Sequence, residues 1–300
     1  MESAPVAIFG VTGFIGRHLA ARLALEGIPV TGVSRSSVGP VPGVNRWQTT
    51  GTLDLTGCRA VVNLSGHRVD CRWTEANRRE IEGSRAGLTR QLVGHLRSLP
   101  PEKRPPVLLN ASGIGFYGDG SDTVLDETAP AGGDYLARVC VEWEAEAREA
   151  EALDMRVVLL RTGVVLGKGG AAFDKLRAIF RLGLGGRIGS GRQWMPWIHL
   201  QDEVEAMVHL LRSPELRGPF NLAAPQPERN VDFTRKFAAA LHRPALLPVP
   251  GFALKLALGE FAGAVLGGQR AEPAALERSG FRFQFPSLEG ALADLLAGGS

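Results

Sequence analysis

The sequence feature that most constrains the fold is the run VAIFGVTGFIG at residues 6–16. A short apolar segment is followed by glycines at three-residue intervals, and apolar residues then recur with helical spacing. Glycine allows positive φ and close backbone approach, and the free N–H groups at a helix N-terminus bind phosphate. The run therefore predicts a strand, a tight turn and a helix that cradle a pyrophosphate. The residues expected to form this cradle are Gly10, Thr12, Gly13, Phe14, Ile15 and Gly16.

Glycines also occur in turns that only reverse the chain, so this prediction needs support from the rest of the sequence. Short apolar runs alternate with helical segments through the first half, which is typical of a doubly wound parallel sheet. The apolar runs are nearly continuous, as expected for strands buried on both faces. The predicted strands are 5–10, 28–34, 60–65, 107–112 and 155–162, and the predicted helices are 14–26, 74–99 and 135–153.

The second half of the chain has a looser pattern. Its predicted helices are 173–180, 202–211, 232–241, 251–266, 273–278 and 288–296, and its one predicted strand is 219–223. We expect an α/β fold, with a Rossmann-like parallel sheet and a smaller C-terminal substrate lobe. The Rossmann domain would comprise 1–165 and 198–222, and the lobe 166–197 and 223–300. A ligand would lie between them, at the carboxyl ends of the strands.

Composition excludes several classes of function. The net charge of +3 comes from scattered arginines rather than a basic block, which argues against nucleic-acid binding. No apolar run approaches the roughly 18 residues that a membrane span needs. The three cysteines and six histidines show no metal-ligand spacing, so we expect no metal site. No signal peptide is apparent, and we expect a cytoplasmic protein.

The second predicted strand ends in VTGVSRS at 30–36, where a dinucleotide fold meets the adenosine ribose. An acidic side chain there would bind the free 2′-hydroxyl of NAD(H), and none is present. Arginine beside small hydroxyl residues suits a 2′-phosphate instead. We therefore expect NADP(H) rather than NAD(H), with Arg35 pairing with the phosphate and Ser34 or Ser36 assisting. The alternative is a solvated arginine in a polar loop.

A turn of small residues, NLSG at 63–66, follows the next predicted strand. Such a turn lets the backbone pass close to a flat ligand. We expect cofactor contacts at Asn63, Leu64, Ser65 and Gly66, and the alternative is a plain strand-to-loop turn.

The run LLNASGIGFYGD at 108–119 resembles the serine-bearing strand end of extended short-chain dehydrogenases/reductases. Further motifs occur in order along almost the whole chain: GVTGFIG, VVNLSG, RWT, SR, LLRTGVVLGKGG, LGLGGRIGSGRQWMPWIH, GPFNLAAPQP, LGGQRAEPAAL and GFRF. In these motifs the chain is similar to an atypical extended branch, the NAD-dependent epimerase/dehydratase-like family with a C-terminal domain of unknown function.

The resemblance implies a nicotinamide dinucleotide and a catalytic Ser, Tyr and Lys, in which the tyrosine exchanges a proton with the substrate oxygen. Ser112 matches the serine, but no Tyr-x-x-x-Lys motif is present, because Tyr135 is followed four residues later by Val139. The only tyrosines are Tyr117 and Tyr135, which are the candidates for a phenolic acid. Packing through the ring is the alternative role for each. A nucleophilic Cys140 is the weaker alternative to a small core residue.

Further cofactor contacts follow from the same resemblance. We expect them at Ala111 and at the strand end Arg161, Thr162, Gly163 and Val164, where relatives close the nicotinamide pocket with backbone. Arg85 is also expected to contact the cofactor, near the place where many relatives have a structural Asn. Trp194 and Trp197 either line a substrate pocket or join the two lobes, and His199 and Asp202 are expected to be structural.

Two functions fit the sequence. The first is an NADPH-dependent oxidoreductase, or an epimerase using transient hydride transfer, on a small hydroxyl- or carbonyl-bearing substrate. The second is a non-catalytic NADPH-binding protein with a regulatory or redox-sensing role, favoured by the missing Tyr-x-x-x-Lys pair. The sequence does not identify the substrate, and we expect a monomer or a homodimer.

Overall fold

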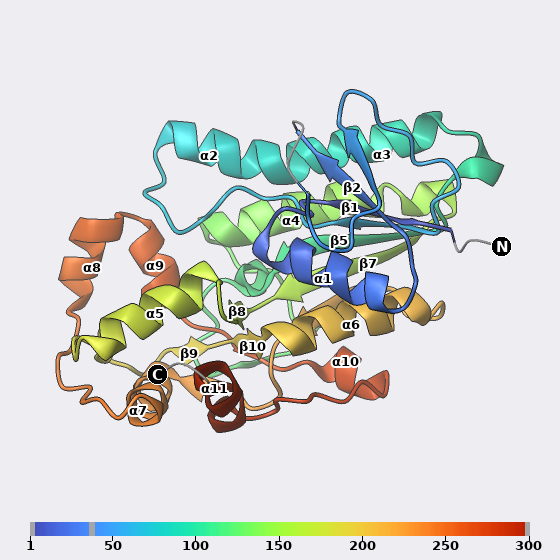
Figure 1. Ribbon diagram of the computed structural model, residues 1–300. Helices are drawn as coiled ribbons and strands as arrows, with labels where there is room; N and C mark the ends of the chain where they lie inside the picture. The colour runs from blue at the N-terminus through green and yellow to red at the C-terminus, as the bar shows by residue number, and fades with distance from the viewer. Residues whose placement is uncertain (1–3, 36–39, 298–300) are drawn as a thin grey trace.

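The computed structural model describes residues 4–35 and 40–297. Within these ranges a parallel sheet of seven strands runs through the molecule in the order β11-β7-β5-β4-β1-β2-β3 (Figure 1). Its strands are β1 (Val6–Phe9), β2 (Val30–Ser34), β3 (Arg46–Thr49), β4 (Ala60–Asn63), β5 (Val107–Gly113), β7 (Arg156–Thr162) and β11 (Gly218–Leu222). The strand order reverses between β1 and β4, which leaves a crevice at the carboxyl ends of the strands. The predicted α/β, Rossmann-like fold is confirmed.

Helices cover both faces of this sheet, which explains the continuous apolar runs (Figure 1). Val6 and Ile8 of β1 face α1 (Phe14–Leu25) and α6 (Leu200–Arg212) in one buried cluster. Ala7 and Phe9 face the opposite side, in a second buried cluster with α3 (Leu88–Ser98) and the end of α4 (Tyr135–Arg148). Each large apolar side chain that becomes fully buried contributes about 1.5–3 kcal/mol, so the strands are held from both sides.

The predicted helix 74–99 is interrupted. It consists of α2 (Glu75–Glu82), a π-helical turn (Gly83–Gly87) and α3. Thr74 caps α2 by accepting a hydrogen bond from the Asn77 N–H at 3.2 Å. A π turn fits one additional residue into the helix and frequently occurs at functional sites. The predicted helix 74–99 is thus helical from Glu75 to Ser98, and Arg85 lies in a π turn within it that the sequence pattern did not indicate.

The C-terminal half builds a separate apolar cluster from α5 (Ala171–Arg181), α7 (Asn230–Ala240) and α11 (Leu288–Leu296). This cluster is distinct from the two at the sheet, whereas Leu276, which falls within the expected lobe, is buried in the first sheet cluster. We propose that the smaller lobe has the boundaries expected from the sequence apart from this segment. The predicted helix 251–266 is wrong in one respect. It is divided into α8 (Gly251–Leu258) and α9 (Phe261–Leu266), because Gly259 has a φ of +61° that ends α8.

The elements that the sequence did not predict are short. They are the edge strand β3, the two- and three-residue strands β6 (Val124–Leu125), β8 (Val164–Leu166), β9 (Trp194–Met195), β10 (Trp197–His199), β12 (Glu228–Arg229) and β13 (Arg270–Ala271), and the 3₁₀ turns Pro101–Lys103 and Ile114–Tyr117. The predicted helix 135–153 ends in a separate 3₁₀ turn, Glu151–Leu153. Helix α10 (Ala274–Arg278) lies within its predicted range. None of the helices among the described residues combines the length and the apolar character that a bilayer crossing requires.

Candidate active site

The glycine turn after β1 adopts the geometry of a phosphate cradle. Gly10 has a φ of +73°, and a Cβ there would lie 2.7 Å from the Leu64 carbonyl oxygen. A Cβ on Gly16 would lie 2.4 Å from the Gly10 carbonyl oxygen, so this glycine permits close packing of α1 against the turn. Gly13 caps α1 without a side-chain hydrogen bond, and the first turn of the helix carries no acidic residue. The N-terminus of α1 therefore remains available to an anion.

A groove of about 740 Å³ lies beside this turn, and we call it the glycine-loop groove. Its walls include the cradle residues Gly10, Thr12 and Gly13, the strand end at Ser34 and Arg35, and the turn Leu64, Ser65 and Gly66. Arg35 is exposed and directly follows the carboxyl end of β2. Ser36, the other predicted phosphate ligand, falls outside the described residues.

A second space of about 530 Å³ lies at the carboxyl ends of β5 and β7, and we call it the strand-end cavity. Ser112, Thr162, Gly163 and Val164 line it together with Ile15 of α1. Most of the remaining wall is apolar or aromatic, from Val69, Leu136, Val139, Trp143, Ile188, Trp194 and the α9 residues Phe261 and Val265. A mostly apolar cavity with a few polar groups is the usual form of a small-molecule site.

Ser112 faces this cavity, but its hydroxyl proton has a partner on the protein. The Ser112 hydroxyl donates to Glu144 Oε1 at 2.8 Å, and Arg161 holds the same carboxylate with two hydrogen bonds of 2.8 Å. Burial alone lowers the pKa of Arg161, but its hydrogen bonds to Glu144 outweigh burial and leave the pKa raised. Glu144 and Arg161 are both buried. Ser112 therefore offers the cavity acceptor lone pairs rather than a free O–H.

The two tyrosines lie outside both spaces. The Tyr117 hydroxyl donates to Asn221 Oδ1 at 2.8 Å and accepts from Arg161 Nη1 at 2.9 Å. Tyr135 packs its ring against Trp73 at 4.7 Å. Burial raises the pKa of both phenols. The pKa of Tyr135 is raised to about 12, mainly by burial and to a lesser extent by the nearby Glu82. Neither tyrosine lines the strand-end cavity, so neither is placed to exchange a proton with a substrate there.

Several predicted cofactor residues also make structural contacts instead of lining either space. The Asn63 amide donates to Thr89 and Asn110 at 3.0 and 2.7 Å. The Arg161 guanidinium is committed to Glu144, as described above. Three further residues of this kind are Phe14, Gly16 and Ala111. The Phe14 ring lies against Gly167 and Gly170, Gly16 packs on the glycine turn, and Ala111 is half-buried in β5.

The structure adds one acidic residue that the sequence analysis did not identify. Glu203, near the start of α6, is fully buried, and its Oε1 accepts a hydrogen bond from the Thr162 hydroxyl at 2.9 Å. Its Oε2 has no partner among the described residues. Burial raises the pKa of Glu203 to about 8, so the carboxyl group is protonated at neutral pH. The position of Glu203 in the helical pattern did not indicate that it is buried, because its burial depends on how α6 packs against β7.

Cys140, His199 and Asp202 have no reactive geometry. Burial raises the pKa of the Cys140 thiol to about 11, which keeps it protonated. Asp202 accepts the backbone N–H groups of Gln284 and Phe285 at 2.8 and 2.9 Å and so ties α6 to the C-terminal segment. His199 lies 3.3 Å from Asp294. Within the part of the chain that the structure describes, no group of metal-ligating side chains converges.

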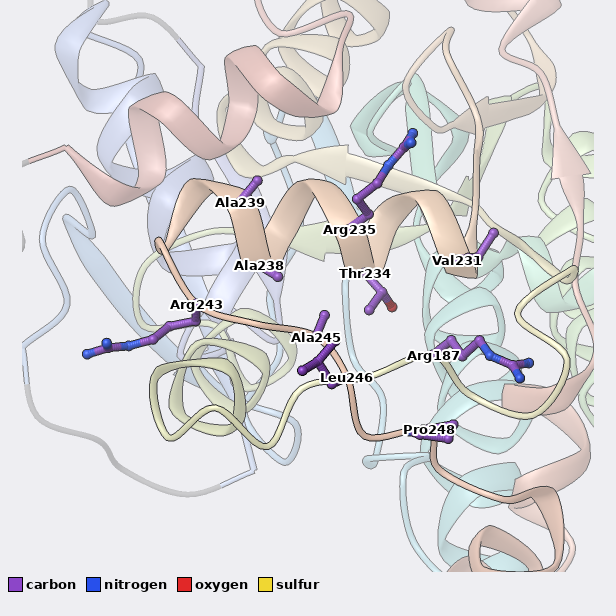
Figure 2. A pocket seen from close by; sticks show the side chains of 10 residues that line it. All are labelled: Arg187, Val231, Thr234, Arg235, Ala238, Ala239, Arg243, Ala245, Leu246 and Pro248. Atoms are coloured by element: carbon purple, nitrogen blue, oxygen red, sulfur yellow. The ribbon is translucent and has the colours of Figure 1, made fainter.

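Another hollow of about 400 Å³ lies between α7 and the segment 243–248. It is bordered by Arg187, Arg235 and Arg243. Figure 2 shows their guanidinium ends pointing away from one another rather than into a common space. The hollow shares no lining residue with the strand-end cavity or the glycine-loop groove, so we do not assign it to the active site.

Comparison with known proteins agrees with this geometry. The model of the NAD dependent epimerase/dehydratase family matches residues 6–223. This chain belongs to the NAD dependent epimerase/dehydratase family. The family match covers the whole parallel sheet and both spaces at its strand ends, except for Asn230 of α7 and the cavity residues between 261 and 269. A separate domain of unknown function, DUF1731, matches residues 249–295, so the resemblance expected from the sequence is confirmed.

Three relatives align with nearly the full length of this chain. An epimerase family protein SDR39U1 homolog from Arabidopsis thaliana, described as chloroplastic, is 39% identical over 97% of this chain and 86% of its own length. Epimerase family protein YfhF from Bacillus subtilis is 34% identical over 97% and 98%. The crystal structure of human epimerase family protein SDR39U1 with NADPH superimposes with a TM-score of 0.89 at 34% identity, over 97% of this chain and 98% of that one.

Proposed function

We propose that this family member binds NADP(H) and acts as an oxidoreductase, or as an epimerase using transient hydride transfer, on a small carbonyl or hydroxyl compound. One observation carries the proposal. The Arg85 guanidinium lines the strand-end cavity and lies 3.2 Å from where a Cβ on Gly66 would stand, and Gly66 lines the glycine-loop groove. We infer that the two spaces adjoin at Arg85, so that a dinucleotide anchored at α1 would extend to Ser112.

The residues present fit this cofactor. Its pyrophosphate would lie on the N-terminus of α1, where a Cβ on Gly10 would clash with the Leu64 carbonyl. Arg35 would pair with the 2′-phosphate, and the strand end from Thr162 to Val164 would contact the nicotinamide. When bound, the nicotinamide supplies or accepts a hydride. The human relative solved with NADPH supports the choice of NADP(H).

Ser112 would position the substrate rather than protonate it. Because its hydroxyl donates to Glu144, its lone pairs remain to accept a hydrogen bond from a substrate hydroxyl. The apolar wall of the cavity would exclude water around the reacting carbon, which favours hydride transfer over side reactions.

The second candidate function, a non-catalytic NADPH-binding protein, is favoured by a different observation. Both tyrosines lie outside the strand-end cavity, and among its described lining residues there is no lysine. The proton-transfer pair that the family resemblance implies is therefore missing from the place where it would act.

Cofactor choice is tested by titrating the purified protein with NADPH and NADH. We expect Arg35→Asp to weaken NADPH binding at least about tenfold and to leave NADH binding nearly unchanged, because a charge-assisted hydrogen bond contributes about 1.5–3 kcal/mol. Arg59→Asp is the matched control, since Arg59 is exposed just before β4, at the opposite end of the sheet. Unchanged NADPH preference in Arg35→Asp would contradict the assignment of this arginine.

Catalysis is tested separately by single-turnover oxidation of bound NADPH against a library of carbonyl compounds. The oxidoreductase is supported if at least one compound oxidises the bound NADPH and if Ser112→Ala lowers the rate of that oxidation. Tight NADPH binding with no oxidation by any compound supports the sensor.

A further inference from the structure

Arg85 is the one charged residue among the described residues that line the strand-end cavity. It lies in the π-helical turn between α2 and α3. The other polar side chains that line the cavity, such as Ser112, Thr162, Asn230 and Gln269, are neutral. The cavity therefore has a net positive charge in otherwise apolar surroundings.

The contacts of Arg85 leave its charge without a counterion. Its Nη1 donates to the Ile81 carbonyl at 3.2 Å, and the guanidinium lies over the Trp143 ring at 5.2 Å. Within the described part of the chain no carboxylate comes within ion-pair distance of Arg85. A guanidinium carries five N–H donors, so the hydrogen bond to Ile81 leaves donors available to a ligand in the cavity that Arg85 lines.

A partly buried cation that pairs with no carboxylate is electrostatically unfavourable. Burial lowers the pKa of Arg85, but a guanidinium remains charged at any ordinary pH. Arg161 provides a comparison within the same molecule, because it is also buried and Glu144 neutralises it through two hydrogen bonds. A ligand that brings a planar anion would give Arg85 the same bidentate arrangement.

We propose that Arg85 binds the carboxylate of the substrate, which makes the substrate class a small oxo or hydroxy acid with an apolar chain. The inference rests on the proposed function and assigns the substrate class of that same cavity. The apolar residues Val69, Leu136 and Phe261 would hold the chain of the acid. Ser112 would accept from the hydroxyl group that is oxidised, or that forms on reduction.

A phosphate of the cofactor is the other source of an anion, since Gly66 belongs to the glycine-loop groove. The structure favours the substrate, because the N-terminus of α1 and Arg35 already provide for the phosphates of a dinucleotide. Arg85 also stacks on Trp143, which lines the strand-end cavity and not the groove. The two sources predict different effects of an Arg85 substitution on NADPH binding.

The test uses the full chain saturated with NADPH and matched pairs of unreactive ligands, titrated by calorimetry. The pairs are unsubstituted carboxylic acids of three to eight carbons, 4-phenylbutyrate, and the amide of each acid. In the wild type we expect at least one acid to bind about 30-fold or more tightly than its amide. This factor is the smallest loss of affinity expected when a buried charge loses its partner.

Variants separate the possible origins of this preference. Arg85→Met should abolish the preference for the acid and leave NADPH affinity within about threefold, whereas Arg85→Lys should retain part of the preference. Arg138→Met is the control, since Arg138 is exposed on α4 and does not line the cavity. The wild-type comparison of acid and amide needs no variant, so the proposal remains testable if Arg85→Met does not fold.

Three results would overturn the proposal. They are equal binding of every acid and its amide, no binding by any acid, and a loss of NADPH affinity of 30-fold or more in Arg85→Met without any acid preference in the wild type. The third result would assign Arg85 to the cofactor. Each of these leaves the proposed function standing as long as the wild type binds NADPH, whereas absent NADPH binding would refute the proposed function itself.

Discussion

Glu203 makes a specific prediction about the pH dependence of stability. Its carboxyl group is fully buried, has one hydrogen bond from Thr162, and has a pKa raised by burial from 4.5 to about 8. In the unfolded chain the same group ionises near its ordinary pKa. Between these two values the folded state holds a proton that the unfolded state releases, so the free energy of unfolding falls as pH rises from about 4.5 to about 8.

The magnitude follows from the same shift. Each pKa unit corresponds to about 1.4 kcal/mol, so the full shift removes on the order of 5 kcal/mol of stability by pH 8, and about 3 kcal/mol by pH 7. The substitution Glu203→Gln keeps the shape of the side chain but cannot ionise. We expect this variant to match the wild type most closely near pH 5 and to exceed it in stability by several kcal/mol at pH 8.5.

Urea unfolding of both proteins at pH 5.5, 7.0 and 8.5 measures this difference. Glu102→Gln is the control, because Glu102 is exposed in a short 3₁₀ turn and its replacement should leave the pH dependence unchanged. If the difference between Glu203→Gln and the wild type stayed constant within about 0.5 kcal/mol over this range, the raised pKa of Glu203 would be refuted.

Three further predictions concern packing, the buried ion pair and the cavity thiol. Gly16→Ala should destabilise the protein by about 1–3 kcal/mol in thermal or urea unfolding, because the added Cβ would lie 2.4 Å from the Gly10 carbonyl oxygen. The control is Gly94→Ala on α3, where an added Cβ would have no atom within 4 Å. This variant should stabilise the protein by up to about 1 kcal/mol. Arg161→Met should cost about 3–5 kcal/mol by leaving Glu144 charged and buried, and adding Glu144→Leu should recover part of that loss; equal stability of the single and double variants would contradict the ion-pair argument. Cys140 should resist iodoacetamide at pH 7.5 in the folded protein and react once urea unfolds it, as followed by mass spectrometry, and rapid alkylation of the folded protein would contradict a pKa of about 11.

Features fixed by local sequence could be predicted well. The turn at Gly10 requires a positive φ and close approach of Leu64, and only glycine satisfies both, so the β1-α1 unit is evident from the sequence. The long strands were found because helices cover both of their faces and make them apolar throughout. Strand β3 was missed because it is a short edge strand with the polar sequence RWQT, which lacks that signal.

Features that depend on distant contacts could not be predicted. Ser112 matches its family motif, but the commitment of its hydroxyl to Glu144 depends on how α4 packs against β5. The sequence marked Arg85 as a departure from its relatives without revealing that it lacks a counterion. The π turn that positions it replaces a stretch with uninterrupted helical periodicity, and pattern analysis does not distinguish the two.

The proton on Glu203 also bears on the charge of the strand-end cavity. Thr162 lines the cavity and donates to Glu203 on its other side, so ionisation of Glu203 would place a negative charge directly behind the wall. Among the described lining residues the other titratable groups are Arg85 and Cys140, and the pKa of Cys140 is raised to about 11. If Arg85 binds a carboxylate, the affinity for that acid should therefore fall as pH rises through about 8 in the wild type. Glu203→Gln should remove this decrease, while the affinity for the matched amide should not change with pH in either protein. An identical decrease in the variant and the wild type would show that Glu203 does not control the charge that the ligand encounters.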